Sequence, residues 1–338
     1  MGKYDDAMYS YLSDNGRFAD LFNGAVFDGE EVLLADALEE GAGRYVQTEV
    51  ECGQRIGAVA HRGNALETQN RYRDIKKHLK EGGSFSVVAI ENQSDIDYTM
   101  PWRIMLYDSL EYEQQIREIE NGKRRKLNRK KKSISRQETR FGQEDRLHPA
   151  YTICLYHGTK HWDGPKSLGD MMKFGSNKKL RKKLFHDYGL SLVCVEDLKE
   201  LSVFQTDLRL LFAALGTRRN KEAMKALYQS EDFVNVPAET ARTIAIMTDN
   251  TQILKKLDEQ GEEGEVNMCQ AWDEIQQEWQ EATIKAKEDG RKEGIKIFIL
   301  DNIEEGKSGE TIVEKLCRRF ALDIGAAQAY YNTYSTSV

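Results

Sequence analysis

The segment from residue 70 to residue 93 constrains the fold more than any other part of the sequence. It reads NRYRDIKKHLKEGGSFSVVAIENQ, in which two runs suited to β-strands flank the turn signal Lys-Glu-Gly-Gly at 80–83. Two such runs joined by a short, glycine-containing turn are typical of a β-hairpin. We therefore expect antiparallel strands at about 72–79 and 84–93.

Helical and strand patterns lie on both sides of this hairpin. Before it, FADLFNGAVF at 18–27 repeats apolar residues at helical spacing. After it, a pattern that begins at Met100-Pro101 predicts a long amphipathic helix that ends near Asn121-Gly122. The β-branched and aromatic run AYTICLYHG at 150–158 then predicts a buried strand. This order of elements indicates an α/β fold.

The chain of 338 residues is long enough for one large core and a smaller appendage. We expect a core at 1–170 with a basic, flexible insert at 122–147, a helical extension packed on the core at 171–265, and an α-helical C-terminal region at 266–338. The C-terminal region carries apolar residues at 3-4-3-4 spacing, namely Trp272, Ile275, Trp279, Ala282 and Ala286. Such a stripe predicts either packing within the chain or a homodimer through the C-terminal helices.

The charge of the chain is unevenly distributed. The formal net charge is -7, but residues 123–147 hold eleven Lys and Arg against three acids, a local net charge of +8 that leaves -15 for the rest. A concentrated basic segment contacts phosphates locally even on an acidic protein, because salt confines its field to about 8 Å. We therefore expect DNA as a partner, and the alternative is a solvated loop. The DNA-binding candidates are Lys123, Arg124, Arg125, Lys126, Arg129, Lys130, Lys131 and Lys132.

Cysteines, histidines and the start of the chain exclude several classes of protein. The five cysteines are odd in number and include no Cys-x-x-Cys pair, which argues against a disulfide framework and a structural zinc site. His157 and His161 are spaced four residues apart, a spacing that brings two rings together on a helix. Because the two histidines follow a strand pattern and not a helical one, their spacing does not predict a metal site. No apolar run approaches the ~18 residues of a membrane span, and MGKYDDAMYSYL lacks the pattern of a signal peptide. We expect a cytoplasmic protein with no membrane partner.

Acidic and amide residues gather at one end of the predicted hairpin. Side chains alternate along a strand, so Glu91 and Gln93 share a face, while Asp74 lies across the hairpin near the same end. Two carboxylates and the carbonyl of Asn92 match the hard oxygen ligands that Mg²⁺ prefers, with Mn²⁺ or Ca²⁺ as alternatives. The pattern therefore predicts a metal site formed by Asp74, Glu91 and Asn92. The alternative is a solvated strand end.

Several dispersed motifs resemble one family of nucleases. The run IENQSDIDYTMPWRIMLYDSLEYEQQ at 90–115 joins Glu-Asn-Gln to Met-Pro-Trp-Arg and an amphipathic helix, and Arg73-Asp74 precedes it. FADLFNGAVF, YTICLYHGTKHWDGPKSL and DLRLLFAAL add to the likeness, which covers roughly residues 15–335 in order. Together these motifs resemble the recombination-promoting nuclease, or transposase-like, family of the PD-(D/E)XK nuclease superfamily.

The resemblance implies a restriction-endonuclease-like core, with a mixed central sheet flanked by helices, and metal-dependent hydrolysis of phosphodiester bonds. Asp74, Glu91 and Gln93 would be the catalytic residues, with Gln93 in the place of the lysine found in most of the superfamily. A neutral amide has no titrating group near pH 7, so the nucleophile must come from metal-activated water that Gln93 orients. Arg73 and Arg103 would stabilise charge on the phosphate.

We therefore expect an Mg²⁺-dependent DNA endonuclease with low sequence selectivity, linked to recombination, mobile elements or defence. Asp20, in the first helical pattern, matches an acid that supplies a further contact; the alternative is a solvated position on an amphipathic face. Two other functions stay open. One is a catalytically inactive DNA-binding or partner-binding protein that keeps the nuclease fold, and the other is a non-nucleolytic interaction protein built around its helical tail.

Overall fold

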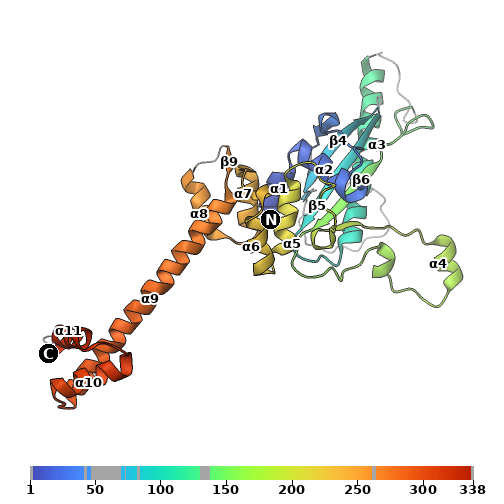
Figure 1. Cartoon of the computed structure of the whole chain (residues 1–338). Coiled ribbons are helices and arrows are strands. Elements are labelled where there is room, and N and C mark those ends of the chain that lie inside the picture. Colours follow the sequence, from blue (N-terminus) through green and yellow to red (C-terminus); the bar gives the residue numbers. More distant parts are fainter. Residues whose placement is uncertain are drawn as a thin grey trace. The chain divides into compact units, whose positions relative to one another are not determined.

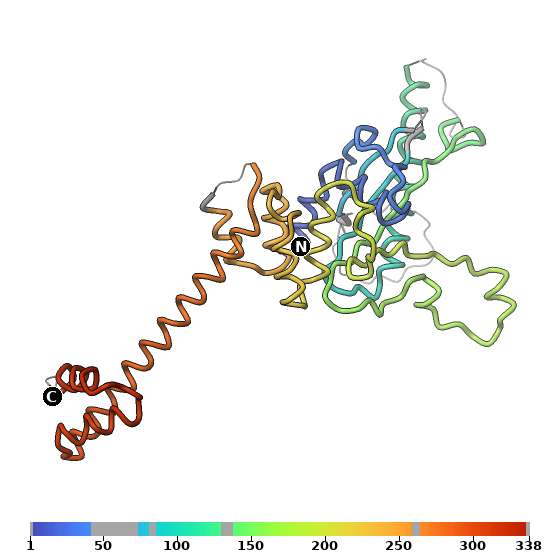
Figure 2. Tube along the Cα trace, in the orientation of Figure 1, coloured from blue at the N-terminus to red at the C-terminus, as the bar shows by residue number. Residues whose placement is uncertain are grey.

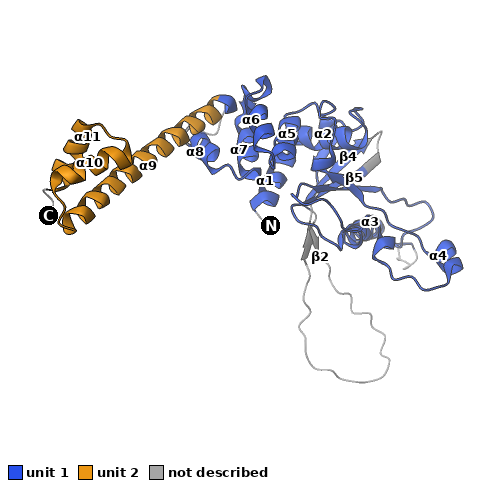
Figure 3. Cartoon of the chain, turned by 60° about the horizontal axis from the view of Figure 1, so that its bottom comes forward, with its two compact units in different colours: residues 1–269 blue, residues 270–338 orange. Residues whose placement is uncertain are grey.

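The structure is a computed structural model that describes residues 3–41, 44–46, 70–72, 74–81, 84–129, 138–260 and 264–335. The chain divides into two compact units, residues 1–269 and residues 270–338 (Figure 3). The boundary predicted after residue 265 lies close to this division. No division falls at residue 170, because the segment 171–265 belongs to the same compact unit as the residues before it.

A mixed five-stranded sheet lies in the first unit, and its strand order is β1-β4-β5-β6-β7 (Figure 1). Neighbours are antiparallel from β1 to β5, and β6 and β7 run parallel to β5. The predicted α/β class is therefore confirmed. The strands are β1 (Leu38–Glu40), β4 (Ile75–Glu81), β5 (Ser84–Gln93), β6 (Ala150–Tyr156) and β7 (Ser191–Cys194).

The predicted hairpin is formed by β4 and β5. Strand β5 has the predicted bounds, and the register pairs Ile75 with Ile90 at one end and Glu81 with Ser84 at the other. Strand β4 begins three residues later than predicted, because the chain bends at Asp74 and β3 (Asn70–Tyr72) pairs with β2 (Arg44–Val46) in a separate two-stranded sheet. The two glycines of the predicted turn lie outside the described residues.

Helices cover both faces of the sheet. Side chains alternate along β4, so Lys76 faces α3 (Met100–Arg129) and forms a buried ion pair with Glu111 at 2.7 Å. Lys77 faces the opposite side and donates to the Ser13 carbonyl at 2.6 Å, between α1 (Lys3–Leu12) and α2 (Asn15–Val26). Both lysines are buried, and each has an oxygen partner that offsets its loss of hydration.

The prediction that the helix after the hairpin ends near residues 121–122 is wrong, because α3 continues to Arg129. Lys and Arg are strong helix formers, and one interior glycine costs only about 1 kcal/mol. Ion pairs also hold this turn: Lys123 pairs with Asp145, and Arg124 lies 4.0 Å from Glu120. Residues 123–129 of the predicted flexible insert are therefore helical, and residues 130–137 lie outside the described part of the chain.

The predicted helical extension at 171–265 is helical only in part, because β7 lies within this range and belongs to the central sheet. Helices follow from residue 208, and Figure 2 shows the yellow ones beside the blue N-terminal helices. Arg17 of α2 ties them together, with Nε 3.0 Å from Asp207 and Nη1 2.7 Å from Glu239. The elements are α4 (Lys178–Leu184), α5 (Leu208–Thr217), α6 (Lys221–Tyr228), α7 (Ala238–Met247), α8 (Thr251–Gln260) and the small strand pair β8 (Val236–Pro237) and β9 (Glu265–Val266). Short 3₁₀ turns occupy Ala35–Ala37, Leu168–Met171, Val195–Asp197 and Glu231–Phe233.

The second unit is helical. It contains all but the first two residues of α9 (Met268–Glu304), together with α10 (Gly309–Phe320) and α11 (Ile324–Ser335). Its core joins the C-terminal half of α9 to the two short helices through Ile295, Ile299, Ile312, Val313, Leu316 and Ala327. Across the described ranges of both units, no helix is long and apolar enough to cross a membrane.

Candidate active site

The structure brings Asp74 and Glu91 to the same end of the β4–β5 hairpin. Ile75 pairs with Ile90, so Asp74, one residue before β4, lies across from Glu91. Oδ2 of Asp74 accepts the backbone N–H of Asn92 at 2.8 Å. Glu91 is fully buried. The two acids therefore lie at the same end of the hairpin, as the sequence pattern predicts, and the Asp74 carboxylate contacts the backbone of Asn92.

Arg103 holds Glu91 from the first turn of α3. Its Nη2 lies 3.1 Å from Oε2 of Glu91, and its Nη1 lies 3.0 Å from Oδ2 of Asp97. Asp97 also organises the helix start, because its side chain accepts the N–H of Thr99 and its carbonyl accepts the N–H of Met100. The spacing between Glu91 and the Met-Pro-Trp-Arg motif thus returns the guanidinium to the end of β5.

Burial and charge set the protonation of this cluster. Burial raises the pKa of Asp74, although the N–H of Asn92 and the charge of Arg103 act against it. Burial also opposes the charge on Asp97, but hydrogen bonds from Thr99 and Arg103 outweigh it and lower the pKa of Asp97. The pKa of Arg103 is raised, because Glu91 and Asp97 more than offset its own burial. Arg103 therefore stays a cation, and Asp74 takes up a proton more readily than Asp97.

Asn92 and Gln93 point to different partners. Gln93 donates from Nε2 to the carbonyl of Asn92 at 2.8 Å, on the oxygen that the sequence pattern assigns to a metal. Nδ2 of Asn92 donates to the carbonyl of Asp5 in α1 at 3.0 Å, so its side chain lies on the opposite face of the sheet from Glu91. Among the described residues, Oδ1 of Asn92 is buried with no hydrogen-bond partner.

The donor types of the cluster fit Mg²⁺. Asp74, Glu91 and the Asn92 carbonyl offer hard oxygens, and Mg²⁺ is commonly held by one or two carboxylates with water filling its other positions. Within the described ranges, no group of three or more His, Cys, Asp and Glu side chains is arranged to hold a metal. Arg103 pairs with Glu91, and Gln93 covers the Asn92 carbonyl. A metal must therefore displace both contacts.

Sequence reasoning missed Asp5, and it considered His157 only as one half of a pair with His161. His157 follows β6, is buried, and lies with Nε2 3.6 Å from Oδ1 of Asp5, while its backbone N–H donates to the Gln93 carbonyl at 3.0 Å. The charge of Asp5 contributes to the raised pKa of Asp74. For Asp5, the signal in the sequence was the acid pair at the start of α1. His161 is exposed, so the two histidines do not form a common site.

Asp20 does not join the cluster. The oxygens of Asp20 accept the backbone N–H groups of Gln205 at 2.9 Å and Thr206 at 2.8 Å, together with the Thr206 hydroxyl. Asp20 is buried, and its contacts anchor the segment before α5. Its surroundings therefore match neither of the predicted roles, which were an accessory contact at the site and a solvated position on a helix. Arg73 lies outside the described residues.

The basic segment presents part of its charge at the end of α3. Arg124, Arg125, Lys126 and Arg129 are exposed, whereas Lys123 is engaged by Asp145 and by the Arg140 carbonyl. The predicted contacts Lys130, Lys131 and Lys132 lie outside the described residues. The separate helix α4 carries a second group of exposed cations, which are Lys178, Lys179, Arg181, Lys182 and Lys183.

A polar cleft of about 410 Å³ opens where β5 and β6 end. Ser94 and His157 line it from these strands, and Arg218 and Arg219 line it from the end of α5. Arg218 donates from Nη2 to the carbonyls of His157 at 2.7 Å and Gly158 at 2.6 Å. Burial lowers the pKa of Arg218, with Glu196 acting against it. The cleft thus places two cations beside the strand ends that carry the candidate site.

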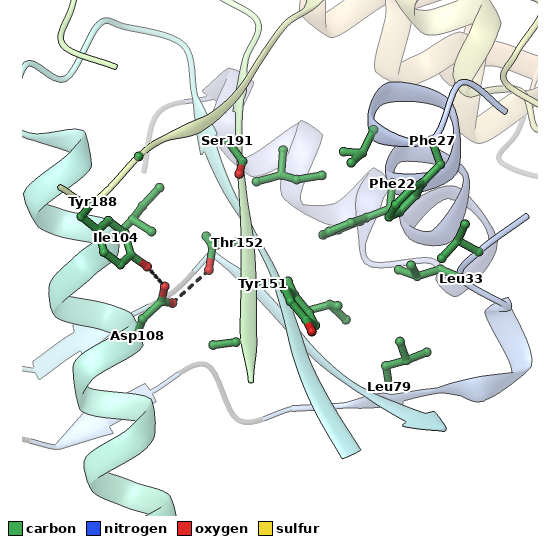
Figure 4. Close-up of a pocket in the computed structure, with 16 residues that line it drawn as sticks. Phe22, Phe27, Leu33, Leu79, Ile104, Asp108, Tyr151, Thr152, Tyr188 and Ser191 are labelled. Atoms are coloured by element: carbon green, nitrogen blue, oxygen red, sulfur yellow. Dashed lines mark hydrogen bonds between the residues drawn. The ribbon is translucent and has the colours of Figure 1, made fainter. Parts of the chain in front are cut away.

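A larger apolar cavity of about 490 Å³ lies elsewhere on the sheet, at the start of β6 (Figure 4). Phe22, Phe27, Leu33 and Leu79 form one side of it, as Figure 4 shows, with Tyr151 between them and the far side. On that far side Asp108 accepts hydroxyl hydrogen bonds from Thr152 at 3.1 Å and from Tyr188. Since hydroxyl groups contact both of its oxygens, Asp108 is a structural carboxylate in this arrangement.

Comparison of the chain with protein-family models, with curated proteins and with solved structures found no match in any of the three.

Proposed function

We propose that this protein is a metal-dependent DNA endonuclease with a restriction-endonuclease-like core. The observation that carries the proposal is the juxtaposition of Asp74 and Glu91 on an antiparallel hairpin, with the backbone of Asn92 between them. The mixed sheet, covered by helices on both faces, supports the fold. The resemblance of the Glu-Asn-Gln and Met-Pro-Trp-Arg motifs to a nuclease family suggests the reaction to be tested, which is metal-dependent hydrolysis of phosphodiester bonds.

Asp74, Glu91 and the Asn92 carbonyl would hold Mg²⁺ or Mn²⁺, and the ion when bound would supply Lewis-acid activation of water and phosphate. Gln93 lies beside the Asn92 carbonyl and has no titratable group, so it orients the attacking water and does not remove its proton. Arg103 is a cation that contacts Glu91 directly. Once released, it stabilises negative charge on the scissile phosphate.

The surface charges fit a backbone contact with little base reading. Arg125 and Arg129 are four residues apart on α3, so they share one exposed face of the helix. Arg218 and Arg219 border the polar cleft at the end of β5 and β6. Cations that meet phosphates give affinity and orientation without sequence information. The proposed substrate is therefore DNA of no fixed sequence.

Supercoiled plasmid incubated with the full chain and Mg²⁺ or Mn²⁺ tests the proposal. Nicking is expected for the wild type, with a loss of at least about 100-fold for Glu91→Gln, a replacement that keeps size and removes charge. Glu113→Gln is the matched control, because Glu113 forms only an exposed ion pair with Arg117 on the same helix. Equal cleavage by Glu91→Gln and wild type would reject this site.

A second function is a DNA-binding protein that keeps the fold without hydrolysis. The contacts of Arg103 with Glu91 and of Gln93 with the Asn92 carbonyl favour it, because both candidate ligands already have partners in the chain. This function predicts salt-sensitive DNA binding with no cleavage by the wild type in either metal. Anisotropy of a labelled duplex, measured on the same preparation used for nicking, separates the two functions.

A further inference from the structure

Within the second unit, the middle of α9 lacks packing against the other described residues. Every residue from 277 to 293 is exposed, a stretch of about 25 Å at 1.5 Å per residue. An isolated helix of this length is marginal in water, and each interior glycine costs about 1 kcal/mol more. At Gly290 and Gly294 an added Cβ would meet no atom within 4 Å among the described residues. These glycines therefore serve no packing purpose within the described part of the second unit.

One face of this helix combines large apolar residues with small ones. At 100° per residue, Trp279, Thr283, Ala286, Gly290 and Ile297 fall within about 60° of each other. Trp279 is 56% exposed and Ile297 is 52% exposed. Exposed bulky residues in line with small ones are typical of a helix–helix contact.

This face lies on the side of α9 away from the core of the second unit. Ile295 and Ile299 are about 160–200° from Trp279 around the helix, and they are the residues that pack on α10 and α11. The core of the second unit and the exposed face of α9 therefore use opposite sides of one helix. A partner on the exposed face leaves the core of the unit undisturbed.

The charges along α9 indicate the direction of that partner. Residues 273–281 contain four acids and no Lys or Arg, whereas residues 285–296 contain five Lys and Arg against three acids. Two copies of α9 side by side in the same direction would bring like charges together. An antiparallel pair sets the acidic part of each copy against the basic part of the other.

The apolar face is also complementary to itself in the antiparallel direction. With the midpoint between residues 284 and 285, Trp279 lies opposite Gly290 of a second copy, and Thr283 lies opposite Ala286. A two-fold contact repeats each pair, because residue i meets residue j and j meets i. Each indole thus faces a position without a side chain, and this contact accounts for the glycine in an exposed helix.

We propose that α9 is the self-association surface of this protein and that its occupant is the α9 helix of a second copy, paired antiparallel about residues 284–285. The inference does not rest on the proposed nuclease activity. It predicts a dimer of twice 38.8 kDa for the full chain in solution. Sedimentation equilibrium across a range of concentrations measures the mass and the dissociation constant.

A size exchange between the two facing positions tests the register. Gly290→Trp sets indole against indole and is expected to raise the dimer dissociation constant at least tenfold, and Trp279→Gly leaves a hole and weakens the dimer. The double variant restores one large and one small residue per contact, so its constant is expected to return to within about threefold of the wild type. Glu288→Trp is the control, since residue 288 lies on the opposite side of the helix.

Three results would overturn the proposal. The first is a wild type that stays monomeric at about 100 µM. The second is Gly290→Trp dimerising as tightly as the wild type, which would show that residue 290 does not lie in the contact. The third is a double variant no better than the single ones. Circular dichroism at 222 nm checks that all variants stay helical, and Gly290→Trp is expected to gain helix stability as its dimer weakens.

Discussion

Removing the cation that faces Glu91 is the most direct probe of the candidate site. In Arg103→Met the side chain keeps similar bulk, but the fully buried carboxylate loses the guanidinium 3.1 Å away. Breaking a buried ion pair from one side costs about 3–5 kcal/mol. The Arg103 side chain is itself 24% exposed, so the ion pair is only partly shielded from solvent and the lower end of this range applies. We expect the free energy of unfolding to fall by about 3 kcal/mol at pH 7.

The dependence on metal identifies the cause of this loss. Millimolar Mg²⁺ is expected to stabilise the variant more than the wild type, because no cation competes for Glu91. The control is Arg117→Met, which removes an exposed i,i+4 pair with Glu113 and is expected to cost about 0.5 kcal/mol or less.

Urea unfolding followed by circular dichroism measures these changes, with an unchanged slope as the sign that only stability has altered. A loss below about 1 kcal/mol at pH 7 would show that Glu91 does not depend on Arg103. An equal effect of Mg²⁺ on variant and wild type would refute the idea that metal and guanidinium share one carboxylate.

Charged groups in the first unit give three further predictions. Burial raises the pKa of Asp74, so its charged form opposes folding at neutral pH and not in acid; Asp74→Asn is expected to raise the urea midpoint at pH 7 and to leave it unchanged near pH 3. Glu111→Gln leaves buried Lys76 without its carboxylate and is expected to cost about 3–5 kcal/mol in the same assay, whereas Lys76→Met with Glu111→Leu recovers most of the loss. Neutralising Arg125 and Arg129 is expected to weaken duplex binding and to lower the slope of log affinity against log salt by about 0.9 for each phosphate that these side chains no longer neutralise, measured by anisotropy.

Local patterns were enough to predict the hairpin and the approach of its two acids. The two-residue period of a strand and the position of the turn together determine which residues face each other. Counting residues from the turn therefore predicts that Asp74 lies across from Glu91. The extent of α3 could not be obtained in this way. A glycine and a run of cations resemble a helix end, but Lys123 finds its partner Asp145 twenty-two residues later in the chain.

Contacts between distant segments decided what the sequence could not. Asp5 contacts Asn92 from a helix that lies 87 residues earlier in the chain. Only the packing of α1 on the sheet brings these two residues together. Asp20 matched a family acid by position, but its neighbours at 205–206 arrive from another part of the chain and occupy its oxygens. A motif records which residue is present, whereas tertiary packing determines what that residue contacts.

The contacts around Glu91 also imply a coupling between metal and DNA under the proposed function. A metal at Glu91 releases Arg103, and a released guanidinium beside a phosphate gains a new anionic partner. Each ligand would then lower the cost of binding the other, and this coupling is equal in both directions. The affinity for Mg²⁺ is therefore expected to rise when a duplex with a non-hydrolysable phosphate is present, and Arg103→Met should abolish the increase. A calorimetric titration that shows the same Mg²⁺ affinity with and without the duplex would exclude Arg103 as the link.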